Sequence, residues 1–304
     1  RKHALHGGFN AVPYLNDADV VLLLDMIGPP WYPETAMRPA QAKIIAIGED
    51  PLRARMPYHA AAADVTLTGH PDAALAQLVA LLPNQTSANA ERGEALKVAN
   101  DTRRDEWHKM AQQQAATVPI DARWLCEELN ASLPDNAIVV DETILTNFTI
   151  LHVMDELEPG QFVNAMNGGL GTGLGAALGV KLANAERPVI VMLGDGGFNY
   201  NPPLAAVGFC QEYQIPITII IGDNGRWRAM QMVTEQLYPE GWAKQTNNYY
   251  GSHIAPQINY ASIADMVGGH GELVTEPDEI RPALQRALQA NTDGRVAILD
   301  IIIG

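Results

Sequence analysis

The feature that most limits what this chain can fold into is an alternation of short, β-branched apolar runs with amphipathic stretches of helical spacing. The clearest runs are residues 20–24 (Val-Val-Leu-Leu-Leu), 43–47 (Lys-Ile-Ile-Ala-Ile), 188–193 and 216–221. Strands that are apolar at nearly every position are buried on both faces, and helices between them connect the strands of a parallel sheet. The sequence therefore predicts an α/β fold in which helices flank parallel sheets.

The alternation stops between residues 85 and 118, where polar residues dominate. We expect this stretch to be a linker, partly helical around residues 103–114, between α/β domains at residues 1–84 and 119–304. The first domain is predicted to have strands at 20–25, 43–47 and 65–67 and a helix at 72–82. The second is predicted to have helices at 121–133, 203–213, 260–267 and 277–290, and strands at 137–140, 188–193, 216–221 and 296–303.

Composition excludes several classes of protein. Of 304 residues, 47% are hydrophobic and 18% are charged, which is typical of a globular protein. No apolar run approaches the roughly 20 residues of a membrane-spanning helix, and the first residues lack the apolar core of a signal peptide, so we expect a cytoplasmic protein. A net charge of -15 would repel nucleic acid and anionic membranes. The two cysteines, Cys126 and Cys210, are too few for a disulfide framework and are predicted to be buried thiols.

Polar turns follow two of the predicted strands. Residues 194–197 (Gly-Asp-Gly-Gly) follow the strand at 188–193, and residues 222–225 (Gly-Asp-Asn-Gly) follow the strand at 216–221. Ligands of open parallel sheets bind outside the carboxyl ends of the strands. Asp195 offers a carboxylate oxygen and Asn224 an amide oxygen, which suits magnesium bound to a diphosphate. Either turn alone is ordinary, but the two together predict a magnesium and diphosphate site.

These turns, with the glycine-rich stretch at 167–179 (Asn-Gly-Gly-Leu-Gly-Thr-Gly-Leu-Gly-Ala-Ala-Leu-Gly), resemble the diphosphate-binding domain of thiamine diphosphate enzymes. The family's motif begins Gly-Asp-Gly and ends in a pair of asparagines. The group most resembled is acetolactate synthase and benzoylformate decarboxylase. Residues 19–25 and 47–55 are similar to the family's central domain. The resemblance implies a partial central Rossmann-like domain at residues 1–84 and a thiamine diphosphate-binding domain at residues 119–304.

The resemblance also implies a set of metal ligands. Asp195 and Asn224 would bind magnesium through their side chains, and Arg226 through its main-chain carbonyl. Two positions depart from the family pattern. Asp223 replaces the first asparagine of the usual pair, and Gly197 stands where serine is common.

Contacts with the cofactor are implied in the same way. Leu170 takes the place of the bulky apolar residue that bends the cofactor, and the carbonyl of Gly168 would face the pyrimidine amino group. Glycine N–H groups would face the diphosphate, and residues 142–143 fall in the family's other diphosphate-contacting turn. The implied cofactor-binding residues are Glu142, Thr143, Gly168, Leu170, Gly194, Gly196 and Gly197.

The implied function is thiamine diphosphate- and magnesium-dependent decarboxylation or carboligation of a 2-oxo acid, by a lyase or transferase. In the family, a glutamate on a separate pyrimidine-binding domain activates the cofactor, and we identify no counterpart in these 304 residues. We therefore expect this chain to supply the diphosphate and metal half of a site. The activating glutamate is expected on a missing N-terminal domain or a second chain, within a homo-oligomer.

Three other functions stay open. Residues 171–176 (Gly-Thr-Gly-Leu-Gly-Ala) fit a dinucleotide-binding fingerprint, with Asp195 as the ribose-binding acid, which would indicate a nicotinamide-dependent oxidoreductase. The short strand at 162–163 and the further glycines disfavour it. An acyl-CoA lyase on the same fold would use basic residues such as Arg226 and Arg228. The third alternative is a cofactor-binding fragment without catalytic activity.

A few residues are weaker candidates for the substrate pocket. His253 and His270 lie in the region that follows Asn224. Trp227, Met230 and Met232 belong to a predicted helix after the metal turn, where packing competes with a pocket-lining role.

Overall fold

The computed structural model describes residues 3–26, 41–51, 63–82, 87–165, 169–254 and 258–304. Its described residues divide into two compact units, residues 3–101 and 102–304. Within the described residues, no helix is long and apolar enough to cross a membrane.

The smaller unit has a three-stranded parallel sheet in the order β1-β2-β3. The strands are β1 (Val20–Leu24), β2 (Lys43–Gly48) and β3 (Val65–Thr68), and α2 (Pro71–Leu81) follows them. The short helix α1 (Val12–Leu15) precedes the sheet. Leu23, Ala42, Ile44 and Ala46 form its small core. The strands and the helix expected here are confirmed.

The stretch expected to be a linker is mostly one helix, α3 (Ser87–Gln112), and the division between the two compact units falls inside it. Its last turns belong to the larger unit. There His108 contacts Glu127 at 2.6 Å and Asp155 at 3.3 Å, and Arg104 donates to Asp155 at 2.5 Å. The C-terminal part of α3 is therefore held by a cluster of charged side chains.

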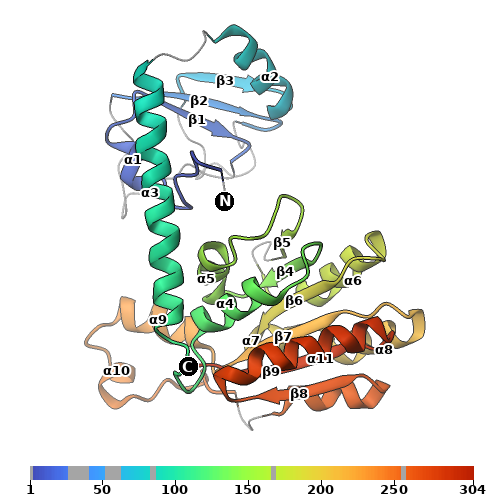
Figure 1. Cartoon of the computed structure of the whole chain (residues 1–304). Helices are drawn as coiled ribbons and strands as arrows, with labels where there is room; N and C mark the ends of the chain where they lie inside the picture. The colour runs from blue at the N-terminus through green and yellow to red at the C-terminus, as the bar shows by residue number, and fades with distance from the viewer. Residues whose placement is uncertain (1–2, 27–40, 52–62, 83–86, 166–168, 255–257) are drawn as a thin grey trace. The chain divides into compact units, whose positions relative to one another are not determined.

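The larger unit is built on a six-stranded parallel sheet in the order β5-β4-β6-β7-β9-β8 (Figure 1). The chain passes from β4 outward to β5 and then returns to the other side of β4, so the order of strands reverses between β4 and β6. Crevices at such a reversal, outside the carboxyl ends of the strands, are the usual ligand sites of open α/β sheets. The strands are β4 (Ile138–Glu142), β5 (Phe162–Asn164), β6 (Val189–Gly194), β7 (Thr218–Asp223), β8 (His270–Val274) and β9 (Ala297–Ile302).

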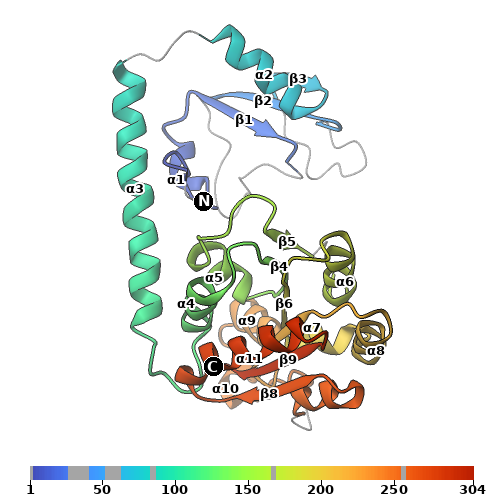
Figure 2. The same cartoon turned by 45° about the vertical axis from the view of Figure 1, so that its right-hand side comes forward.

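Helices cover both faces of this sheet, and most residues of its central strands are therefore apolar whichever face they point to. Figure 2 shows α4 and α5 on one side and α6 and α8 on the other. Along β6, Ile190 and Met192 face the first layer, whereas Val191 and Leu193 face the second. The helices are α4 (Ala122–Ser132), α5 (Thr146–Val153), α6 (Gly173–Ala183), α7 (Asp195–Tyr200), α8 (Pro203–Tyr213), α9 (Arg228–Leu237), α10 (Trp242–Thr246) and α11 (Ile280–Thr292).

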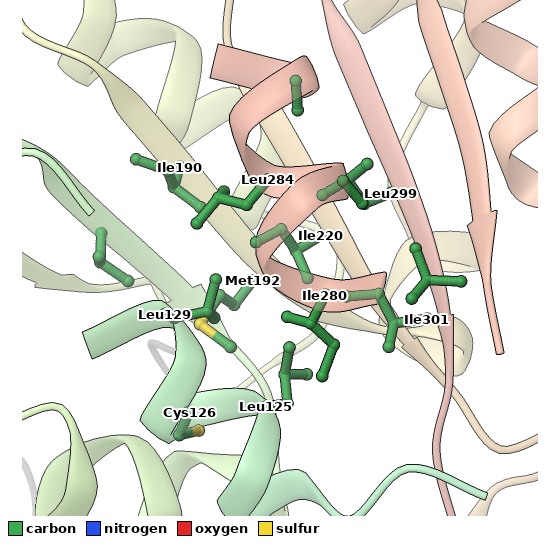
Figure 3. Packing of buried hydrophobic residues seen from close by; sticks show 14 of the residues in the cluster. Leu125, Cys126, Leu129, Ile190, Met192, Ile220, Ile280, Leu284, Leu299 and Ile301 are labelled. Carbon is green, nitrogen blue, oxygen red and sulfur yellow. The ribbon is translucent and has the colours of Figure 1, made fainter. Parts of the chain in front are cut away.

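The first of these layers packs α4 and α11 onto the sheet. Figure 3 shows Leu125 and Leu129 of α4 beside Met192, with Leu284 of α11 near Ile190. Burial of this much aliphatic surface fixes the sheet on which the polar turns are displayed. Cys126 lies in this layer and Cys210 lies in the other, and both are buried free thiols as expected.

The structure differs from the expected elements at a few places. Residues 260–267 form a 3₁₀ helix, η2 (Tyr260–Val267), and a 3₁₀ turn, η3 (Pro277–Glu279), precedes α11. The strand β8 was not expected, since it includes His270 and Glu272 and is paired on one side only. Edge strands tolerate polar residues, so β8 lacks the continuous apolar pattern of the central strands.

Candidate functional site

A pocket of about 400 Å³ lies at the carboxyl ends of β4, β6 and β7 in the larger unit. The wall includes the turn after β4 (142–146, from the last residue of β4 to the first of α5) and the turn after β6 (194–197, the end of β6 and the start of α7). It also includes the segment after β7 (Asn224 and 226–230). Leu170 and Tyr200 also line the pocket. The pocket therefore occupies the point where the strand order reverses.

The three expected metal-binding residues meet at this pocket. The backbone N–H of Arg226 donates to Asp195 Oδ2 at 3.2 Å and to Asn224 Oδ1 at 3.2 Å. Two oxygen atoms from neighbouring strand ends are thus gathered around one peptide group. The carbonyl of Arg226 accepts the N–H of Arg228 at 2.9 Å and keeps a second lone pair.

Asp223, the departure from the family pattern, lies against Asp195. Its carboxylate is buried and accepts the N–H of Gly225 at 2.8 Å. Burial, a side-chain hydrogen bond with Asp223 and repulsion from that residue raise the pKa of Asp195 above its ordinary value. Two carboxyl groups this close are unfavourable unless they share a proton or bind a cation.

The donor set suits a hard cation. Carboxylate, amide and main-chain oxygens are the ligands that magnesium takes in proteins, with the remaining positions filled by water or phosphate. Within the described part of the chain, no cluster of three His, Cys, Asp or Glu side chains could hold a metal. A cation here would therefore depend on the Asn224 and Arg226 oxygens as well as on carboxylate. The residues fit magnesium with a diphosphate.

The glycines of the turn after β6 are closely packed. The N–H of Gly196 donates to Asp195 Oδ1 at 2.8 Å, and a Cβ at Gly196 would collide with the ring of Trp227. Gly197 lies between Glu142 and Leu170, with a Cβ there 3.8 Å from Leu170 Cδ2. Gly194 borders the pocket at the end of β6. The small residues bring the backbone to the pocket wall.

The other expected cofactor contacts are placed as follows. Leu170 is half-buried and lines the pocket, whereas Gly168 lies outside the described residues. Thr143 lines the pocket too, but its hydroxyl donates to Asp141 Oδ1 at 2.7 Å. The carboxylate of Glu142 accepts the backbone N–H groups of Gly171 and Gly173.

Among the weaker candidates, the structure brings Trp227 and Met230 to the pocket. Met232 and both histidines are not part of the pocket lining that the structure describes. His270 instead contacts Glu272 at 3.2 Å on the edge strand β8. Tyr200 also lines the pocket, and its ring meets that of Trp227 edge-on with the ring centroids 5.4 Å apart. This residue was not predicted from the sequence. A single tyrosine at the end of a short helix carries no periodic signal that could have indicated it.

The geometry argues against dinucleotide binding at residues 171–176. That mode needs free N–H groups at the start of α6, where a pyrophosphate would bind. Those groups already have acceptors: Gly171 and Gly173 donate to Glu142, and Leu174 donates to Asn201 Oδ1 at 3.0 Å. The fingerprint is therefore better explained by close packing of α6.

Comparison with protein families decides the relationship. The family described as "Thiamine pyrophosphate enzyme, C-terminal TPP binding domain" matches residues 146–301, half of the chain, and this range includes both polar turns. The chain belongs to the thiamine pyrophosphate enzyme family. Thiamine pyrophosphate is another name for thiamine diphosphate, so the resemblance inferred from the motifs is confirmed.

The curated relatives of the chain are named for several different activities. A probable acetolactate synthase of Mycobacterium bovis is 30% identical over 183 residues, 60% of this chain and 32% of the relative. A benzoylformate decarboxylase of Pseudomonas aeruginosa is 29% identical over 173 residues, 57% of this chain and 31% of the relative. A mouse 2-hydroxyacyl-CoA lyase 2 is 27% identical over 192 residues, 60% of this chain and 27% of the relative. The chain spans about a third of the length of these relatives.

Solved structures of thiamine pyrophosphate enzymes share the fold. A 4-hydroxybenzoylformate decarboxylase of Rhodococcus jostii RHA1 superposes with a TM-score of 0.70 at 22% identity, covering 96% of this chain and 50% of that one. A benzoylformate decarboxylase of Polynucleobacter necessarius gives 0.70 at 18% identity, with the same coverage. The expected α/β architecture, with parallel sheets flanked by helices, is confirmed.

Proposed function

We propose that this chain provides the diphosphate and metal half of a thiamine diphosphate- and magnesium-dependent site that decarboxylates or ligates a 2-oxo acid. The observation that carries the proposal is the meeting of Asp195, Asn224 and Arg226 at the pocket. The acetolactate synthase and benzoylformate decarboxylase relatives support the 2-oxo acid as the substrate class.

The polar side of the pocket would hold the charged end of the cofactor. Asp195, Asn224 and the carbonyl of Arg226 would bind magnesium, which in turn neutralises a diphosphate. The backbone at Gly194 and Gly197 leaves room for that group because no side chain projects from it, whereas the space beside Gly196 is taken by the Trp227 ring. A cation held by the Asp195 carboxylate would offset the repulsion between an acidic chain and an anionic diphosphate.

The apolar side of the pocket would orient the rings. Leu170, Trp227 and Met230 line it and exclude water from the reacting region. When bound, thiamine diphosphate supplies a nucleophilic carbon and an electron sink for the 2-oxo acid. The contribution of the chain is to fix the cofactor's position and its electrostatic surroundings.

A carboxylate that activates the cofactor would come from outside the residues that line this pocket. Among the described residues that line the pocket, the acidic ones are Glu142 and Asp195. Glu142 is occupied by backbone donors, and Asp195 is assigned to the metal. We propose that another protein segment or chain, within a homo-oligomer, completes the site.

Calorimetric titration tests the proposal directly. The full chain should bind thiamine diphosphate in the presence of magnesium and bind it much more weakly when EDTA removes the metal. NAD should give no heat under the same conditions. Equal affinity for thiamine diphosphate with and without magnesium would contradict the metal assignment, and NAD binding would favour an oxidoreductase.

A second candidate is an acyl-CoA lyase on the same fold. It is favoured by Arg226 and Arg228, which line the pocket as two cationic side chains, and by the mouse relative. Arg228 is held by Glu235 at 3.0 Å, which leaves Arg226 as the more available cation. If the wild-type chain binds a 2-hydroxyacyl-CoA and Arg226→Gln does not, this candidate is supported. If the wild-type chain does not bind the 2-hydroxyacyl-CoA, the proposed activity on a 2-oxo acid is favoured.

A further inference from the structure

Glu142 ends the strand β4 beside the pocket, yet its carboxylate does not face an empty space. One oxygen accepts the N–H of Gly171 and the other accepts the N–H of Gly173. The side-chain amide of Asn201 donates to the same carboxylate at 3.2 Å. Glu142 is 1% exposed, so these three donors replace the water that a buried carboxylate loses.

The same contacts solve a local problem at the start of α6. The first N–H groups of a helix need acceptors from outside the helix. Thr172, in the N-cap position, makes no side-chain cap; its hydroxyl points to Ala165 and donates to that carbonyl at 2.7 Å. Glu142 accepts from Gly173, and Asn201 Oδ1 accepts from Leu174 at 3.0 Å. A negative charge at this end of the helix is also favoured by the helix dipole.

Asn201 is itself fixed to α7. Its side-chain amide donates to the carbonyl of Gly197 at 2.9 Å, and its backbone N–H donates to the carbonyl of Phe198 at 3.1 Å. One residue therefore joins the end of α7 to the start of α6. Because Glu142 is anchored in the sheet, the glycine segment 169–173 is held from two sides.

The segment is also sterically matched to its supports. Gly171 has a φ of +100°, and a Cβ there would lie 2.9 Å from the carbonyl oxygen of Tyr200. A Cβ at Gly173 would collide with the Glu142 carboxylate and lie 2.9 Å from Leu193 Cδ2. The two glycines allow the backbone to approach the carboxylate closely enough to donate to it.

We propose that Glu142 and Asn201 are positioning residues that hold the glycine segment 169–173, and with it Leu170, in the place where the rings of the cofactor bind. This inference rests on the proposed function. Glu142 then acts through the backbone of the segment and does not bind the diphosphate, which its negative charge would repel.

Two probes separate this role from a direct diphosphate contact. Inorganic diphosphate with magnesium needs only the turns after β6 and β7, whereas thiamine diphosphate with magnesium also needs the glycine segment. Glu142→Gln keeps the size of the side chain but turns an NH₂ group toward a backbone donor. Calorimetry on the full chain should show thiamine diphosphate binding weakened about tenfold, with diphosphate binding changed less than about twofold.

Hydrogen exchange gives a readout that needs no cofactor. In Glu142→Gln, amides of residues 169–174 should exchange about tenfold faster, while those of β6 and β7 keep their rates. Asn201→Ala should act in the same direction with a smaller effect, because Glu142 keeps its two backbone donors. Glu212→Gln, an exposed residue of α8, removes the same charge and should change neither measurement.

The outcomes are distinguishable. Equal weakening of both probes in Glu142→Gln would overturn the positioning role in favour of a direct contact. Unchanged exchange at residues 169–174 in both variants would overturn it as well. If the wild-type chain binds no thiamine diphosphate, the proposed function fails, and the exchange measurement still decides whether Glu142 holds the segment.

Discussion

Asp195 and Asp223, at the ends of neighbouring strands, hold their carboxyl groups in hydrogen-bonding contact beside the pocket. In water such a pair would separate, but here both residues are buried and fixed by backbone N–H groups. Under the proposed function, a cation bound beside the two groups would replace the proton that they share and offset their repulsion.

The first prediction concerns the metal ligands. Asp195→Ala should weaken magnesium-dependent binding of thiamine diphosphate by about 100-fold or more, since it removes the charged ligand. Asn224→Ala should weaken it by only about tenfold, because it removes a neutral oxygen. Calorimetric titration with and without magnesium measures both. Unchanged affinity in Asp195→Ala would show that the cation binds elsewhere.

Leu170 provides the second prediction. Leu170→Ala should leave binding of magnesium and inorganic diphosphate within about twofold of wild type, because the side chain bears no polar atom. Turnover by the completed enzyme should fall about tenfold or more, since the rings lose the apolar contact that orients them. Leu182→Ala, at an exposed leucine of α6, serves as the control. Full turnover in Leu170→Ala would reduce the residue to a packing role.

A third prediction follows from the buried carboxyl group of Asp300. Burial, offset in part by the Tyr260 N–H at 2.8 Å and reinforced by the charge of Asp223, raises the pKa of Asp300 to about 7. Its other oxygen has no hydrogen-bond partner among the described residues. The folded state therefore favours the protonated acid. This contribution to stability is complete below the unfolded pKa of about 4 and is lost as the pH rises through about 7.

Asp300→Asn, which mimics the protonated acid, should thus be more stable than wild type at about pH 8, by on the order of 2 kcal/mol. The difference should shrink toward zero at about pH 4. Denaturant unfolding of both proteins across this range measures it, and groups common to the two proteins cancel. A difference that does not change with pH would mean that Asp300 keeps an ordinary pKa.

The fourth prediction concerns the cluster at the end of α3. Burial lowers the pKa of His108, but hydrogen bonds and charge from Glu127 and Asp155 outweigh it, so the net pKa is raised. Arg104 also donates to Asp155 at 2.5 Å. The stabilising contacts of the imidazolium are complete below its unfolded pKa of about 6.5 and are lost as the pH rises through the higher folded value.

His108→Gln should therefore destabilise the larger unit by about 1–2 kcal/mol at pH 6 and by less at pH 9. Thermal or denaturant unfolding at the two pH values measures the change. A loss of stability in His108→Gln that grows as the pH rises would contradict a raised pKa of His108.

The last prediction tests whether the site is complete. The full chain should bind thiamine diphosphate but should not speed exchange of the carbon-2 proton beyond that of free cofactor, because the acidic residues of the described pocket lining are already engaged. NMR follows the exchange. Adding a chain or segment that carries the activating carboxylate should restore exchange, and fast exchange without it would mean that Glu142 or Asp223 activates the cofactor.

The sequence predicted those parts of the fold that carry a continuous signal. The strands β6 and β7 are apolar at consecutive positions because helices cover both faces, and a pattern of that kind has few alternatives. The edge strand β8 and the short helix α10 were not predicted. Each is partly exposed to solvent and mixes polar with apolar residues, so neither shows a continuous apolar pattern.

The site was likewise predictable only in part, namely where residues directly follow the strongly patterned strands. Asp195 and Asn224 follow adjacent parallel strands, and topology alone places them together. The binding partners of Glu142 could not be read from the sequence. They depend on Gly171, Gly173 and Asn201, whose positions are fixed by helix packing and not by any local pattern.

The burial of Cys126 and Cys210 has a practical use. Burial raises the pKa of both thiols, to about 12 for Cys210, so neither is a thiolate at neutral pH and neither is accessible to alkylating reagents. Neither cysteine of the chain would therefore compete with an introduced cysteine in site-directed labelling. A cysteine introduced in place of Met230, which is 55% exposed at the pocket, would be the one reactive thiol, and a fluorophore attached there would report on arrival of cofactor, substrate or partner in real time.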